Sequence, residues 1–461
     1  STVGVIEGTT HGIAFTVAGT IENYGRIEGT TNGIRAASLG TVTINNFQGT
    51  ITSPSCGIRL EASGNMMLNN IGTISATGTA GTGVHIGVGT GNLVINDGPI
   101  SGTQYGIYSA VAMPAAGAYT AGINNISLNG TVTGGTDGIY LAAGGSVDNK
   151  GVITGTVGNG IYVSGGTGAI NNDFVTSNNE GIKGGTNGIH LVNGGSVINR
   201  RVIEGGTNAI WSEASGTVEN YAIITGVNNG IKFDAGGTIT NYSSIKATAG
   251  NGIYIYGSTG LINNNPLYGS IEGTTAGVYM ESGGTIFNRS NIIGVDNGVV
   301  MDSGGTLNNN NNVSASNGTG VLVSDGTGNL INNSGVIDGS AYGIYSAVNM
   351  PAVGASPAGI NNAGTGSITG GTDGIHLAAG GTVENAGAIT GTDENGIYVQ
   401  GGAGTINTGD LITAPAAWSA APDASWVTAE KGQDGESLTI TVEDNTSGTE
   451  REARITVSAG Q

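Results

Sequence analysis

The sequence predicts an all-β fold: a right-handed, three-sided parallel β-helix of about 17 coils, followed by a small antiparallel β piece. The main observation is a phrase of Gly, Ile, an aromatic residue and Leu, followed by Gly-Gly-Thr-Val-x-Asn, which returns about every 21 to 26 residues along almost the whole chain. Each copy also holds three short β-type runs separated by corners of small residues. The repeat stops near Thr413, where tryptophan and proline appear. We therefore predict a solenoid over residues 1–413 and a separate module over residues 414–461.

One copy, residues 138–156, illustrates the predicted coil. Its runs GIYL, SVDN and GVIT each have the length and composition of a short strand. Side chains alternate across a strand, so Ile139 and Leu141 should point inward and Tyr140 outward. Each run would stack on the same run of the next coil and form one of three sheets. The first inward residue of the successive copies is Ile13, Ile34, Ile58, Val84, Ile107, Ile139, Ile161, Ile189, Ile210, Ile231, Ile253, Val278, Val299, Val321, Ile344, Ile375 and Ile397.

Composition excludes several classes of function. The net charge is −19, with 13 Lys and Arg against 32 Asp and Glu, so the chain lacks the basic surface that nucleic acid requires. No run is apolar enough to predict a membrane span. The one cysteine, Cys56, cannot form an internal disulfide, and no Cys/His cluster predicts a metal site or a cofactor.

Asparagine recurs at two fixed places in the coil. One Asn ends the second run of almost every copy, and stacked coils would superpose these side chains. Such amides can hydrogen-bond along the axis, or they can form a polar track for a ligand. The predicted column is Asn23, Asn45, Asn69, Asn96, Asn124, Asn149, Asn171, Asn199, Asn220, Asn241, Asn263, Asn288, Asn309, Asn332, Asn361, Asn385 and Asn407. Asn-Gly pairs, as at Asn187 and Asn229, are expected to turn a corner in the left-handed conformation before the first run.

The outward position of the first run carries many aromatic side chains. Parallel stacking would align them in one stripe along the solenoid. Rings in line can bind sugar faces or a neighbouring rod. Alternatively, β-propensity and stacking within the sheet already favour tyrosine at this position. The candidate residues are Tyr140, Tyr162, His190, Trp211, Tyr254, Tyr279 and Tyr398.

The last part of the chain follows a different pattern. It contains, in order, residues 424–428 (ASWVT), residues 435–442 (GESLTITV), Asn445, Arg451 and residues 453–457 (ARITV). This order resembles the BACON domain, an immunoglobulin-like β-sandwich module of Bacteroidetes surface proteins. The strands expected before the first tryptophan are absent, so the resemblance implies an incomplete sandwich. Its exposed ladder edges should be completed by another strand.

The solenoid is similar to the right-handed parallel β-helix passengers of bacterial autotransporters and adhesins, because of its Gly-Thr-Val-x-Asn repeats. This resemblance implies an extracellular or bacterial cell-surface protein. Parallel β-helices also include polysaccharide lyases and hydrolases, which need clustered carboxylates. The best acidic candidates, Asp137, Asp296, Asp373 and Asp393, fall at corners where turn propensity explains them. We therefore expect no enzymatic activity and no catalytic residue.

The function that we predict is a structural extracellular fibre or surface rod that assembles end to end. The chain begins in the third run of a coil and ends in the incomplete module, so both ends are expected to be open. The module either caps its own rod or binds the first coil of another subunit, and we favour the second, which grows a filament head to tail. The residues of this interface are Val3, Val5, Ile6, Trp418, Trp426, Ile440, Val442, Ile455 and Val457. The alternatives are a carbohydrate-binding surface adhesin and, in third place, a polysaccharide-processing enzyme.

Overall fold

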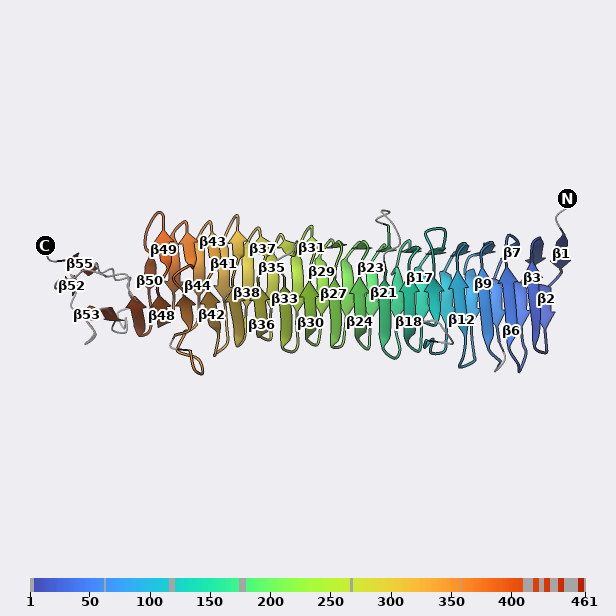
Figure 1. Ribbon diagram of the computed structural model, residues 1–461, viewed down its shortest axis with the longest axis horizontal. Coiled ribbons are helices and arrows are strands. Elements are labelled where there is room, and N and C mark those ends of the chain that lie inside the picture. The colour runs from blue at the N-terminus through green and yellow to red at the C-terminus, as the bar shows by residue number, and fades with distance from the viewer. Residues whose placement is uncertain are drawn as a thin grey trace. The chain divides into compact units, whose positions relative to one another are not determined.

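The computed structural model describes residues 4–61, 64–115, 121–173, 180–265, 268–356, 358–408, 418–422, 427–431, 438–442 and 455–459. These residues form 55 β-strands and no helix. Most strands belong to three parallel sheets, A, B and C, which build a solenoid of about 17 turns (Figure 1). A small antiparallel piece follows near the C-terminus. The predicted all-β, three-sided parallel solenoid is confirmed, and its right-handed sense stays a prediction.

The solenoid divides into two compact units, which we describe separately. Unit 1 comprises residues 1–235 and 243–248, and unit 2 comprises residues 236–242 and 249–461. In both units, one coil adds one strand to each of the three sheets.

One coil of unit 1 shows how the sequence forms the sheets. β17 (Asp137–Leu141) lies in sheet B, β18 (Gly145–Asn149) in sheet C and β19 (Val152–Gly155) in sheet A. Each strand pairs in parallel with its equivalents in the neighbouring coils. The corner between β17 and β18 requires glycine, because Gly144 has a φ of 84° and Gly145 a φ of 143°. The three predicted runs are therefore confirmed as three strands.

Sheet B contains the predicted aromatic stripe, and its strands recur once per coil. In unit 1 they are β2 (His11–Phe15), β5 (Asn32–Ala36), β8 (Cys56–Leu60), β11 (Thr82–Ile86), β14 (Tyr105–Ser109), β17, β20 (Ile161–Val163), β23 (Asn187–Leu191), β26 (Asn208–Ser212) and β29 (Asn229–Phe233). In unit 2 they are β32 (Asn251–Ile255), β35 (Ala276–Met280), β38 (Asn297–Met301), β41 (Thr319–Val323), β44 (Tyr342–Ser346), β47 (Asp373–Leu377) and β50 (Ile397–Val399).

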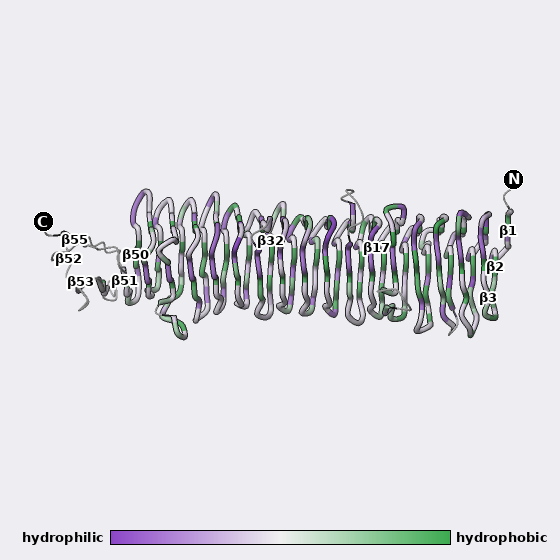
Figure 2. Tube along the Cα trace, viewed as in Figure 1, coloured by the Kyte–Doolittle hydropathy of each residue, from purple (hydrophilic) through white to green (hydrophobic). Residues whose placement is uncertain are grey.

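The interior of each unit is a stack of aliphatic side chains. Ile139 and Leu141 are fully buried, whereas Tyr140 between them is half-buried on the outer side of the sheet. The parallel register places Ile139 beside Ile161, and Ile161 beside Ile189. Figure 2 shows apolar positions recurring in coil after coil. Burial of each Ile contributes roughly 1.5–3 kcal/mol, so this repetition is the main source of stability.

A buried asparagine ladder runs along sheet C within each unit, but partly through other residues than predicted. Asn46, for example, is in register with Asn23 and with Asn70. Within a unit, each ladder Nδ2 donates to the Oδ1 of the next coil at 2.8–2.9 Å. All these amides but the half-buried Asn385 are buried, and they are bonded to one another, which favours the structural interpretation over a ligand track.

The prediction was one residue early in eight copies whose second run ends in Asn-Asn or Asn-Thr, whereas in the run that ends in Asn308-Asn309 it named the ladder residue Asn309. Side chains alternate, so the residue directly after an inward Ile leaves the buried face, and only the second residue returns to it. Ile44 is inward, Asn45 is not, and Asn46 joins the ladder. The misplaced residues are Asn45, Asn69, Asn124, Asn171, Asn263, Asn332, Asn361 and Asn407.

The Asn-Gly pairs do not form the predicted left-handed corner. Asn187 and Asn229 are instead the first residues of the extended strands β23 and β29. Their side chains bond to Asn208, which lies between them, at 2.9 and 2.8 Å. The glycine is needed for close packing, since a Cβ on Gly188 would lie 2.6 Å from the carbonyl oxygen of Ala209.

The C-terminal piece pairs with the last coil of its own chain. β54 (Leu438–Val442) runs antiparallel to β51 (Gly404–Thr408) of sheet C, and β53 (Val427–Lys431) pairs with β54. β52 (Trp418–Pro422) and β55 (Ile455–Ala459) form a separate antiparallel pair. In the structure the module therefore pairs with the last coil of its own rod, which was the first of the two alternatives considered for this module.

Candidate functional site

The outward column of sheet B lies on consecutive coils, as the sequence predicts. In unit 1 the column is Arg35, Arg59, His85, Tyr108, Tyr140, Tyr162, His190, Trp211 and Lys232. In unit 2 it is Tyr254, Tyr279, Val300, Leu322, Tyr345, His376 and Tyr398. All seven candidate stripe residues belong to this column. Tyr140, Tyr162, His190 and Trp211 lie in the row of unit 1, and Tyr254, Tyr279 and Tyr398 lie in the row of unit 2.

The row of rings in unit 2 is interrupted. Tyr254 and Tyr279 stack, with their centroids 5.1 Å apart and an interplanar angle of 19°. The next two positions are Val300 and Leu322, and aromatic residues resume at Tyr345. One face of the Tyr279 ring is therefore covered by Tyr254, and its neighbour in register on the other side is the aliphatic Val300.

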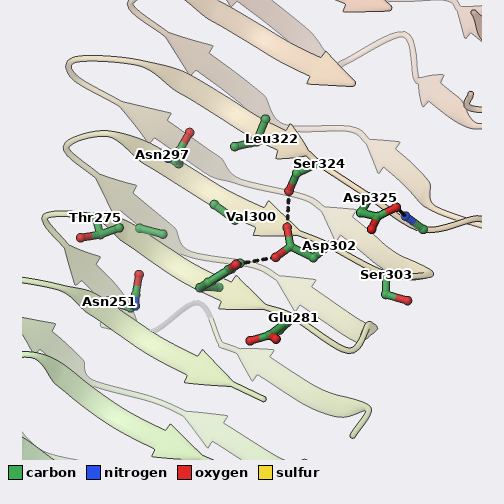
Figure 3. A pocket seen from close by; sticks show the side chains of 13 residues that line it. Asn251, Thr275, Glu281, Asn297, Val300, Asp302, Ser303, Leu322, Ser324 and Asp325 are labelled. Atoms are coloured by element: carbon green, nitrogen blue, oxygen red, sulfur yellow. Dashed lines mark hydrogen bonds between the residues drawn. The ribbon is translucent and has the colours of Figure 1, made fainter. Parts of the chain in front are cut away.

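A groove of about 680 Å³ opens at this interruption (Figure 3). Two successive short side chains leave space that tyrosine rings fill elsewhere in the column. The groove combines one ring and two outward aliphatic side chains with three carboxylates and several amides and hydroxyls. Its lining residues are Asn251, Thr275, Ala276, Tyr279, Glu281, Asn297, Val300, Asp302, Ser303, Leu322, Ser324, Asp325 and Gly326.

Hydroxyl groups orient two of the carboxylates. The Tyr254 hydroxyl donates to Oε2 of Glu281 at 2.7 Å, and the Tyr279 and Ser324 hydroxyls both donate to Asp302 (Figure 3). Burial, with these carboxylates, raises the pKa of both Tyr254 and Tyr279. The phenols therefore remain protonated donors, and the wall of the groove presents oriented oxygen acceptors to a ligand.

In unit 1 the described rings cover one another. Tyr162 stacks on Tyr140 and on His190, each with a centroid distance of 4.9 Å. The ring centroids of His190 and Trp211 are 4.1 Å apart, and the two rings are nearly parallel, with an interplanar angle of 5°. The Lys232 ammonium covers the Trp211 ring at 4.8 Å. For these residues the structure favours stacking within the sheet, because their faces are occupied by their neighbours.

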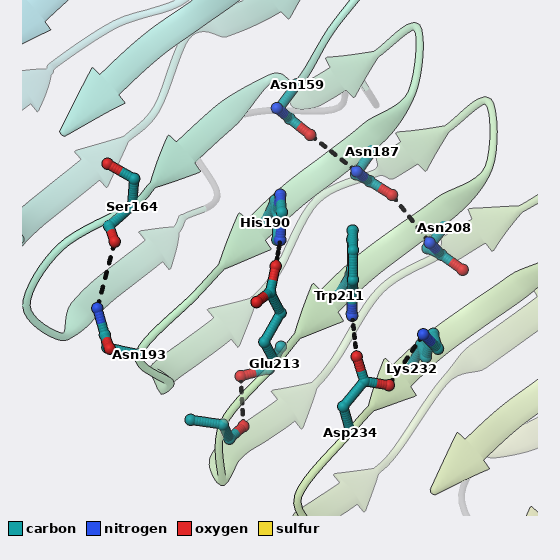
Figure 4. Close-up of polar contacts among 12 residues, drawn as sticks. Asn159, Ser164, Asn187, His190, Asn193, Asn208, Trp211, Glu213, Lys232 and Asp234 are labelled. Carbon is teal, nitrogen blue, oxygen red and sulfur yellow. Dashed lines mark hydrogen bonds and ion pairs between the residues drawn. The ribbon is translucent and has the colours of Figure 1, made fainter. Parts of the chain in front are cut away.

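The polar atoms of His190, Trp211 and Lys232 in this row also have partners (Figure 4). Nε2 of His190 lies 2.8 Å from Glu213, and Nε1 of Trp211 donates to Asp234 at 2.8 Å. Lys232 forms an ion pair with Asp234 at 2.9 Å. Burial lowers the pKa of His190, although Glu213 opposes the shift. The row in unit 1 is thus a closed set of contacts, unlike the groove in unit 2.

The residues predicted to form an assembly interface fall in both units. In unit 1, Val5 and Ile6 are exposed in β1 (Val5–Gly8), and Val3 lies outside the described residues. In unit 2, Ile440 of β54 is opposite Ile406 of the same chain. Trp426 lies outside the described residues, and the backbones of Trp418, Val442, Ile455 and Val457 lie in β52, β54 and β55.

Sequence reasoning identified Tyr279 but missed the groove beside it. Two signals were available. Val300 and Leu322 replace rings in an otherwise aromatic column, and an acid directly follows the strand in two successive coils, at Glu281 and Asp302. Only the three-dimensional arrangement shows that both features line one space.

Comparison with known families identifies a match in the C-terminal piece. Residues 416–461 match the BACON family, described as "Putative binding domain, N-terminal". This match bears out the resemblance based on the strand pattern of these residues. No curated protein and no solved structure matches the chain. Among the described residues, no helix has the length and apolar character needed to cross a bilayer. The BACON match and the β-solenoid fold together fit a surface or binding protein.

Proposed function

We propose that the protein is a secreted or cell-surface binding protein that takes a polysaccharide in the groove of unit 2 without cleaving it. The observation that carries this proposal is the position of Tyr279, the one aromatic ring among the lining residues of a groove that also presents oriented carboxylates, amides and hydroxyls. Sugars bind proteins by stacking an apolar face on an aromatic ring while their hydroxyls bond to such acceptors. The BACON match supports a binding role for the chain.

Retention on an array of polysaccharides tests the proposal. Tyr279→Ala should reduce retention about tenfold, because it removes the ring against which the sugar stacks. Tyr162→Ala is the matched control, since both faces of that ring are already covered. The control should keep its retention, and the bound polysaccharide should keep its chain length. Equal retention by the two variants, or shortening of the polysaccharide, would contradict the proposal.

A second variant separates the loss of a ligand contact from a general loss of folding. Val300→Tyr would restore a ring at the interrupted position, stack it on Tyr279 and fill part of the groove. It should abolish retention while leaving the melting temperature unchanged or raised. Unchanged retention by this variant would place the binding site elsewhere.

End-to-end assembly, the first function predicted from the sequence, stays a prediction. It joined the C-terminal module of one chain to the first coil of another. In sheet C, β54 of this module pairs with β51 of its own chain. Assembly through the module would therefore have to use an edge other than the one that β51 covers.

A further inference from the structure

Three carboxylates line the groove, and their described partners are all neutral. Glu281 accepts from the Tyr254 hydroxyl, and Asp302 accepts from the hydroxyls of Tyr279 and Ser324. Asp325 accepts from the backbone amide of Gly326 at 2.6 Å. No Lys, Arg or His belongs to the lining. The groove therefore concentrates negative charge that no described ion pair offsets.

Acids at the equivalent position in unit 1 are paired with basic side chains. Like Glu281 and Asp302, they directly follow a sheet B strand. Glu61 lies 2.6 Å from Nε of both Arg35 and Arg59. Glu213 lies 2.8 Å from His190, and Asp234 lies 2.9 Å from Lys232. The absence of a basic partner at Glu281 and Asp302 is therefore a local property of the groove and not of the repeat.

We infer that the ligand of this groove is a polymer of amino sugars that carry free amino groups. This inference rests on the proposed function and adds the chemical class of the ligand. Protonated amines would form charge-assisted hydrogen bonds with the three acids, while one sugar face stacks on Tyr279. An anionic sugar would be repelled, and a neutral sugar would leave the acids desolvated without a counter-charge.

The spread of the acids argues for an extended ligand. Glu281, Asp302 and Asp325 come from three successive coils, and neighbouring coils of a parallel sheet are roughly 4.8 Å apart. In the described part of the chain, no group of three His, Cys, Asp or Glu side chains could hold a metal ion. A chain with an amine on each sugar matches a row of acids better than one compact cation does.

Calorimetric titration of the full chain tests the inference with four probes: an oligomer of β-linked glucosamine, its fully N-acetylated counterpart, an oligogalacturonate and an oligolysine. The pH is chosen so that amines are protonated and carboxylates ionised. The glucosamine oligomer should bind at least about tenfold more tightly than the acetylated one. Added salt should weaken this binding, and the oligogalacturonate should not bind.

Two variants test whether the preference for free amino groups arises in the groove. Glu281→Gln combined with Asp325→Asn should weaken glucosamine binding about tenfold or more and leave the melting temperature near that of the parent. Asp338→Asn is the matched control, because Asp338 is exposed on sheet A of the same unit. It should bind like the parent.

The outcomes separate the two proposals. Equal binding of the acetylated and free-amine oligomers would overturn the inference and leave the proposed function intact. Absence of binding to any sugar would overturn both. Oligolysine binding as tight as that of glucosamine, and unaffected by Tyr279→Ala, would overturn the inference in favour of a cationic peptide.

Discussion

The asparagine ladder gives a sharp test of the strand register in unit 2. Asn332 and Asn333 are adjacent, and only one of them can occupy the buried ladder. The sequence alone indicated Asn332, whereas the structure buries Asn333 and leaves Asn332 half-buried. We therefore expect Asn333→Ala to be strongly destabilising and Asn332→Ala to be mild.

The magnitude follows from the contacts of each amide. The Asn333 side chain donates to Asn362 at 2.8 Å and to the carbonyl oxygens of Gly335 and Ser367 at 3.2 and 3.3 Å. It accepts from Asn309 at 2.8 Å. At about 1 kcal/mol for each bond, with the long bonds discounted and buried partners left unsatisfied, the loss is about 3 kcal/mol.

Asn332 makes two side-chain bonds, to Asn308 at 2.9 Å and from Asn361 at 3.0 Å. Water can replace both in the half-exposed outer row, so its removal should cost less than about 1 kcal/mol. Denaturant unfolding followed by circular dichroism gives the two stabilities, and amide hydrogen exchange locates the weakened coils. If Asn332→Ala lowered the free energy of unfolding as much as Asn333→Ala or more, the register would be refuted.

Three further outcomes follow from single features. Ile231 is fully buried, so Ile231→Asp should place an unpartnered charge in the stack and cost about 4 kcal/mol or more, and unchanged melting would contradict its inward placement. Burial and the nearby Arg59 lower the pKa of His85 from 6.5 to about 4. Between these two pH values the imidazole is protonated in the unfolded chain but not in the folded one, so unit 1 should lose stability as the pH falls from 6.5 toward 4. His85→Gln should remove that part of the pH dependence, and an NMR titration midpoint near 6.5 would argue against it. Deletion of residues 409–461 removes β54 and uncovers the β51 edge, so light scattering should show increased self-association, whereas a strictly monomeric product would speak against this pairing.

The sequence was sufficient for the architecture because the repeat encodes it redundantly. The alternation of Ile139, Tyr140 and Leu141 recurs in coil after coil, and each copy indicates the same inward and outward positions. Errors arose where one residue decides the facing, as in the Asn45-Asn46 pair. There the same residue type stands at two successive positions, so the residue type alone does not show which of the two points inward. Counting two residues from the inward Ile does show it.

The candidate site was harder to predict because it depends on an exception to the repeat. The aromatic column suggested that ring density marks the binding surface. In a parallel sheet, however, equivalent side chains lie about 4.8 Å apart, which is close to the distance at which rings stack. Rings on successive coils therefore cover one another, as Tyr140, Tyr162 and His190 do.

The consequence is that an unbroken row of rings presents edges to a ligand, whereas a groove beside a ring can form where the row ends. Val300 supplies such an end, because it is aliphatic and lies in register with Tyr279, and both residues line the groove. The same argument explains why the acids matter only there. A carboxylate beside an occupied ring, such as Asp234 beside Trp211, is used to hold the row together. One beside the groove, such as Asp302 beside Tyr279, is oriented by the row and lines the groove, where a ligand can reach it.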